Sequence, residues 1–185
     1  MRLSRNRNWG NPQLVRFIER LAENAKKIGW NGLLVGEMSR PRGGPMLSDH
    51  KSHQIGLDVD IWLTPMPDHV QSRQEREFGS ATDVVAPDLL DVDQEVWTHR
   101  HTELIRTAAQ DPGVTRILVN AAIKKALCRE AGADRAWLFK VRRARIADHA
   151  ACGRAGDADR RQLRSIALSQ LRDCPSSGLG DRHRH

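Results

Sequence analysis

The chain has 185 residues, with 30 Lys and Arg against 23 Asp and Glu and a formal net charge of +7. This length suits one domain with its own core, and no apolar run approaches the about 18 residues of a membrane-spanning helix. Residues 141–185 hold ten Arg, five Asp and no Lys or Glu, so most of the basic excess lies there. Because this segment also lacks Trp, Phe and Tyr, nucleic acid is disfavoured as a partner.

The first third of the chain alternates between helical and extended patterns. Asn11-Pro12 indicates the start of a helix, and apolar residues at helical spacing continue to Gly29. A short strand is predicted over 33–38. The Gly- and Pro-rich stretch that follows, 39–49, predicts a loop.

Residues 57–63 alternate between apolar and polar side chains, which predicts a strand with Asp58 and Asp60 on its polar face. The remaining patterns predict a loop over 64–95, helices over 96–109, 121–130 and 160–171, and a strand over 114–120. Together they favour an α+β fold. We expect a small, at least partly antiparallel sheet with outer helices and long loops at one edge.

The residues most suited to chemistry surround this second strand. His50 and His53 lie at the end of the Gly- and Pro-rich loop, and Gly56 allows a close turn that brings His53 toward Asp60. An imidazole and a carboxylate, with one further protein ligand, are what a catalytic Zn²⁺ uses. On spacing alone, solvated loop histidines and an exposed strand carboxylate remain an alternative. Asp58 either orients a ligand or has no role.

Longer stretches of sequence around these residues favour the zinc site over the alternative of solvated residues. GEMSRPRGGPM (36–46) and SHQIGLDVDI (52–61), with RNRNWGNP (5–12), resemble the penicillin-insensitive murein endopeptidases, the MepA family of LAS-type zinc metallopeptidases. The resemblance ends near Val141. It divides the chain into an endopeptidase-like core, 1–141, and an Arg-rich divergent segment, 142–185.

This resemblance implies a zinc site formed by His53 and Asp60, with His50 beside them at the metal. It also implies a second metal position at Asp88 and Asp91, for which two ordinary loop carboxylates are the alternative. The implied reaction is the zinc-dependent cleavage of D-alanyl–diaminopimelyl cross-links in peptidoglycan. The expected partners are therefore cross-link peptides, and the expected compartment is the periplasm.

The sequence departs from the family pattern after residue 142. Members continue with a histidine-rich strand, H-x-x-H-x-H, that supplies the last zinc ligand and the catalytic histidines. Here residues 143–154 contain one histidine, His149, which matches none of those positions, so the catalytic residues stay unassigned. Members also carry a signal peptide, and Met1 resembles an internal methionine. A non-catalytic peptidoglycan-binding or decayed pseudoenzyme domain with a basic tail is thus the alternative function.

Overall fold

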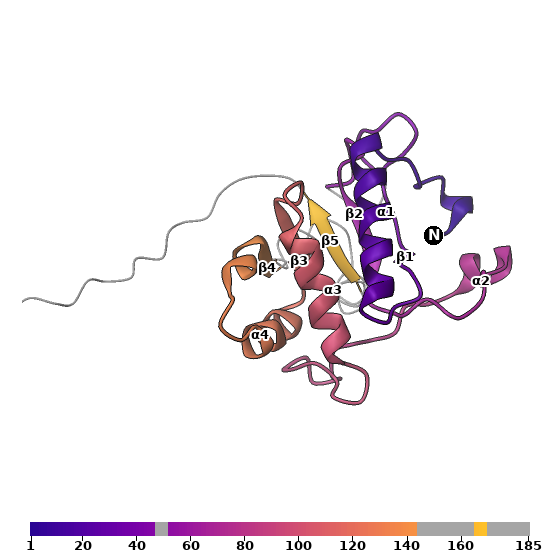
Figure 1. Cartoon of the computed structure of the whole chain (residues 1–185). Coiled ribbons are helices and arrows are strands. Elements are labelled where there is room, and N and C mark those ends of the chain that lie inside the picture. Colours follow the sequence, from indigo (N-terminus) through magenta and orange to yellow (C-terminus); the bar gives the residue numbers. More distant parts are fainter. Residues whose placement is uncertain (47–51, 144–164, 170–185) are drawn as a thin grey trace, which may run out of the picture.

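The computed structural model describes residues 1–46 and 52–143 and the backbone of 165–169. Its elements, in chain order, are η1 (Leu3–Arg5), α1 (Pro12–Lys27), β1 (Leu34–Val35), β2 (Val59–Trp62), α2 (Arg73–Phe78), α3 (His99–Gln110), β3 (Arg116–Val119), α4 (Ala121–Glu130), η2 (Ala136–Lys140), β4 (Val141–Arg143) and β5 (Ser165–Ser169). In Figure 1, α1 and α3 stand side by side in front of the sheet strands, and α4 lies beside β3 and β4.

The long helices begin at side chains that cap them. The Asn11 side chain accepts a hydrogen bond from the Gln13 N–H at 2.9 Å, and Pro12 occupies the first helical position of α1. Asn120 caps α4 in the same way, accepting from the Ala122 N–H at 2.8 Å. These side chains satisfy backbone donors that the first turn leaves unpaired, which fixes where each helix starts.

The described strands form one sheet in the order β1-β2-β5-β3-β4. Neighbouring strands run antiparallel except β3 and β4, which are parallel. The predicted α+β class with a partly antiparallel sheet is therefore confirmed. The helix predicted over 160–171 is wrong for 165–169, because this segment is the strand β5, with Ala167 opposite Asp60 of β2 and Leu118 of β3.

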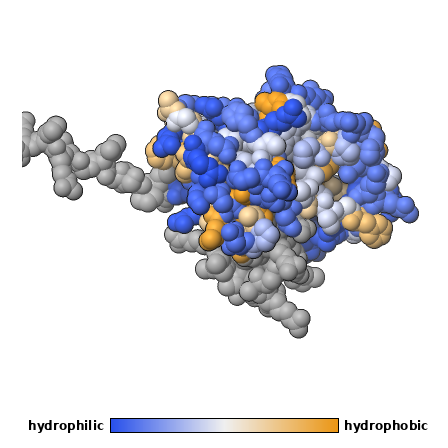
Figure 2. All heavy atoms as spheres, turned by 90° about the horizontal axis from the view of Figure 1, so that it is seen from below, coloured by the Kyte–Doolittle hydropathy of each residue, from blue (hydrophilic) through white to orange (hydrophobic). Residues whose placement is uncertain are grey.

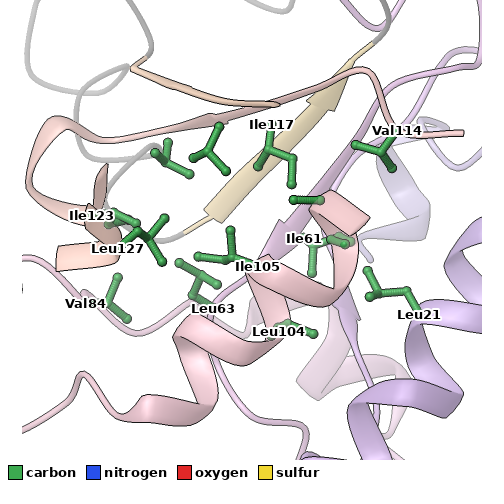
Figure 3. Packing of buried hydrophobic residues seen from close by; sticks show 14 of the residues in the cluster. Leu21, Ile61, Leu63, Val84, Leu104, Ile105, Val114, Ile117, Ile123 and Leu127 are labelled. Atoms are coloured by element: carbon green, nitrogen blue, oxygen red, sulfur yellow. The ribbon is translucent and has the colours of Figure 1, made fainter. Parts of the chain in front are cut away.

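The core lies between the sheet and the helices, as Figure 3 shows. Val59, Ile61 and Leu63 are fully buried and pack on this side of β2. Since successive strand residues point to opposite faces, Asp58 and Asp60 lie on the other face of β2. The apolar alternation of β2 thus both forms the core and turns two carboxylates away from it.

The surface matches the polar composition. Figure 2 shows one face on which hydrophilic residues dominate and apolar residues form small, separate groups. The mean hydropathy of −0.59 agrees with this view. Among the helices that the structure describes, none combines the length and the apolar character needed to cross a bilayer.

A buried histidine joins α3 to the end of β2. His101 lies between the rings of Trp30 and Trp97, at centroid distances of 5.3 and 5.0 Å. Its Nδ1 accepts from the Thr98 N–H at 3.0 Å, so its Nε2–H is the donor to the Leu63 carbonyl at 3.2 Å. Burial lowers the pKa of His101, and this effect outweighs the hydrogen bonds with the Leu63 and Thr98 backbone and the attraction of nearby Glu130.

We expect His101 to make the folded state acid-sensitive. The unfolded chain takes up a proton near the ordinary pKa of 6.5, whereas the folded chain keeps His101 neutral to lower pH. At this residue the unfolded state therefore binds more protons below about pH 6.5, and the contribution of His101 to the free energy of unfolding falls there. In thermal melts between pH 7 and 5, the melting temperature of His101→Gln should fall less steeply with decreasing pH than that of the wild type. The exposed His99→Gln should match the wild type. An unchanged slope in His101→Gln contradicts this role.

Candidate metal centre

Asp60 is held by the chain that follows β1. The Gly36 N–H donates to the Asp60 carbonyl at 2.7 Å, and the Asp60 N–H donates to the Glu37 carbonyl at 2.9 Å. A Cβ on Gly36 would lie 3.1 Å from the Asp60 Cβ, so glycine permits this close approach. The backbone of the predicted ligand is thus fixed by a ladder that extends β1.

His53 reaches Asp60 from the preceding loop. Its side chain is 1% exposed, and its Nε2 lies 3.3 Å from Asp60 Oδ1. The loop is anchored at Gly56, whose carbonyl accepts from the Asn11 N–H at 2.7 Å and whose φ is +72°. The predicted convergence of His53 and Asp60 is present in the structure.

Asp58, on the same face, is buried rather than solvated. It is 5% exposed, and its Oδ1 has no hydrogen-bond partner in the described part of the chain. Burial raises the pKa of Asp58 to about 6, although the charges of His53 and Arg116 act in the opposite direction. For His53, burial lowers the pKa, but the attraction of Asp60, with smaller effects of Asp58 and Glu37, outweighs it and raises the pKa.

This donor set suits a divalent cation. A buried imidazole and a carboxylate face each other, and a second buried carboxylate adds negative potential beside them. The residues described, 1–46 and 52–143, contain no group of three or more His, Cys, Asp or Glu that could hold a metal. Of the three expected zinc ligands, they contain His53 and Asp60, and zinc binding there stays a prediction. The third expected ligand, His50, lies outside the described residues.

The residues of the predicted second metal position have other contacts. Both Asp91 oxygens bind Arg129, at 3.0 and 3.2 Å, and Lys125 lies 3.0 Å from Oδ2. These cations, Arg129 foremost, hold the pKa of Asp91 well below its usual range. Asp88 is exposed and accepts from the Leu90 N–H at 2.9 Å. A second metal at Asp88 and Asp91 stays a prediction.

A cluster of three charged residues near Asp60 was missed by the sequence analysis. Glu37 binds Arg5 and Arg7, the latter at 2.7 Å from Arg7 Nη1 to Glu37 Oε2. These bonds tie the N-terminal segment to the stretch after β1 that pairs with the Asp60 backbone. The sequence hinted at this contact only in that residues 5–12 and 36–46 both resemble the endopeptidase family. No periodicity links residue 5 to residue 37.

The loop before His53 makes one contact that tolerates no side chain. A Cβ on Gly43 would lie 2.4 Å from the Gln54 carbonyl oxygen, whereas a Cβ on Gly44 would meet nothing within 4 Å. Both have positive φ, +67° and +77°, so alanine at either position carries a similar strain of about 1–2 kcal/mol. We expect Gly43→Ala to lower the melting temperature further than Gly44→Ala. Equal shifts in thermal unfolding would show that the close contact is unimportant.

Comparison with known proteins identifies the family. A family model described as penicillin-insensitive murein endopeptidase matches residues 1–151, which include His53 and Asp60. The chain therefore belongs to the penicillin-insensitive murein endopeptidase family, as its motifs predicted.

Individual relatives carry the same name. Penicillin-insensitive murein endopeptidases of Haemophilus influenzae and Pectobacterium atrosepticum are 46% and 49% identical to the chain over 142 residues. That alignment covers 77% of this chain, and 49% and 50% of the two relatives. The chain thus spans about half the length of the curated relatives it matches. Strand β5 lies beyond the residues that the family model matches.

Proposed function

We propose that the chain is a zinc-dependent murein endopeptidase that cleaves D-alanyl–diaminopimelyl cross-links of peptidoglycan in the periplasm. The observation that carries this proposal is the 3.3 Å approach of His53 Nε2 to Asp60 Oδ1 in a chain of this family. His53 and Asp60 would hold the zinc, with His50 as the third ligand. When bound, zinc supplies Lewis acidity toward the scissile carbonyl and a water.

The protein's own contribution is to position these ligands before the metal binds. Hydrogen bonds from Gly36 and to Glu37 fix the Asp60 backbone, and Gly56 fixes the turn after His53. His53 and Asp58 are buried, so water is excluded from one side of the His53–Asp60 pair. The lower local dielectric strengthens the interaction of these ligands with a cation. A site prepared in this way loses little conformational freedom on binding.

A second candidate, a non-catalytic peptidoglycan-binding domain, is favoured by the register of β5. The residue opposite Asp60 in this strand is Ala167, and the segment 165–169 contains no His, Cys, Asp or Glu. The strand beside Asp60 therefore adds no metal ligand. If residues outside the described part supply none either, the domain would still bind its substrate without cleaving it.

One experiment separates the two candidates. The purified chain is loaded with zinc at micromolar concentration, freed of excess metal, analysed for bound zinc and incubated with cross-linked muropeptides. An endopeptidase retains zinc near one equivalent and releases uncross-linked products. A folded chain that binds muropeptides but neither retains zinc nor cleaves them is the non-catalytic domain.

A further inference from the structure

A hollow of about 370 Å³ lies between the N-terminal segment and the loop that leads to His53. We call it the arginine hollow. It is lined by Arg5, Asn6, Arg40, Pro41, Arg42 and Gly43. Three of its six residues are arginines and none is acidic, so it presents concentrated positive charge to a ligand.

Two of the arginines are exposed and lack an acidic partner in the part of the chain that the structure describes. Arg5 is paired with Glu37. Arg40 and Arg42 are exposed, and neither has a carboxylate partner among the residues described. Within the described residues, Arg40 donates one hydrogen bond, to the Pro45 carbonyl at 3.3 Å, of the five that a guanidinium can donate. An exposed, weakly hydrated guanidinium is well suited to a carboxylate, which it can bind with two parallel hydrogen bonds.

Both walls of the arginine hollow are connected by hydrogen bonds to residues that adjoin the candidate metal centre. On one side, the Gly44 N–H donates to the Gln54 carbonyl at 2.8 Å, and Gln54 directly follows His53. On the other side, Arg5 binds the side chain of Glu37, whose carbonyl accepts from the Asp60 N–H. Each wall of the hollow is therefore joined to a residue that either follows His53 in the sequence or pairs with the Asp60 backbone.

We propose that the arginine hollow binds a carboxylate of the peptidoglycan peptide, the one next to the scissile amide. This inference rests on the proposed function. In a D-alanyl–diaminopimelyl cross-link, the carbon that carries the amide nitrogen also carries a free carboxylate. Its carboxylate carbon lies three bonds from the scissile carbonyl carbon, so a substrate with that carbonyl at the metal centre would place a negative charge a short distance beyond it. The hollow gives that charge two guanidinium partners and would select for it.

The test uses a peptide that cannot be cleaved. The probe is an uncross-linked muropeptide that ends in diaminopimelate, compared with the same peptide in which the carboxylate beside the free amine is a carboxamide. We expect the wild type to bind the carboxylate probe about 10- to 100-fold more tightly in calorimetric titrations, as is typical of charge-assisted hydrogen bonds. The double variant Arg40→Gln/Arg42→Gln should lose this preference and bind the carboxamide probe as the wild type does.

The matched control removes the same charge elsewhere. Arg16 and Arg73 are also exposed and lie outside the hollow, so Arg16→Gln/Arg73→Gln should keep the preference. Equal binding of both probes by the wild type overturns the inference, and so does an equal loss in the control variant. Because no hydrolysis is involved, the result holds for a catalytically inactive chain. Hydrolysis of cross-links without any preference for the carboxylate would overturn only the role of the hollow.

Discussion

Replacing His53 with alanine is expected to remove zinc from the chain and to lower kcat/KM for cross-linked muropeptides by about three orders of magnitude or more. His53 faces Asp60 at 3.3 Å, and a zinc site that loses one of its ligands retains neither its affinity nor its geometry. The measurements are bound zinc after removal of excess metal and the initial rate of cross-link cleavage. Zinc retention gives a result even where the rate is too low to measure.

The controls separate ligand loss from unfolding. His99→Ala makes the same chemical change at a side chain that is 73% exposed, and it should leave zinc content and rate unchanged. Asp60→Asn keeps the shape of the second ligand while removing its charge, so it should keep the melting temperature and lose zinc. A His53→Ala chain that is folded and still holds one equivalent of zinc contradicts the proposed site.

A chain that ends at Arg143 is expected to lose cooperative unfolding altogether. The deletion removes β5, which forms four register pairs with β2 and three with β3. Each lost hydrogen bond costs about 1 kcal/mol, and a small domain is stable by only about 5–15 kcal/mol in total. The deletion also separates β1 and β2 from β3 and β4, because β5 is the strand that joins the two pairs.

A second truncation tests whether β5 itself is responsible. A chain of residues 1–169 keeps β5, so it should still unfold cooperatively. Circular dichroism and size-exclusion chromatography would distinguish the two truncations. Cooperative melting of 1–143 at the temperature of the full chain would place the stability of the fold entirely within the first 143 residues.

The sequence predicted those elements whose signals are local. Asn11-Pro12 marks the start of α1, and the predicted helix 121–130 is α4 with the same bounds. The alternation of 57–63 predicted β2 and the face on which Asp60 lies. One local signal was overlooked: Ser72 and Glu75 form a capping box that starts α2 inside the predicted loop 64–95.

The remaining errors involve contacts between distant residues. Leu163, Ile166, Ala167 and Leu171 share a helical face, yet 165–169 is a strand because the adjoining edges of β2 and β3 offer backbone partners. The approach of His53 to Asp60 spans seven positions and was predictable. The burial of Asp58 and the binding of Glu37 to Arg5 and Arg7 depend on tertiary packing, which no spacing in the sequence encodes.

The position of β5 in the sheet also determines when the domain can fold. Asp60 and its partner Ala167 are more than 100 residues apart in the sequence, so their pairing closes a long loop and is slow. During synthesis, β2 and β3 leave the ribosome long before the strand that belongs between them. Their edges stay open to other chains for that interval. Yield from cells should therefore depend on chaperone supply and growth temperature more strongly than the stability of the finished domain suggests.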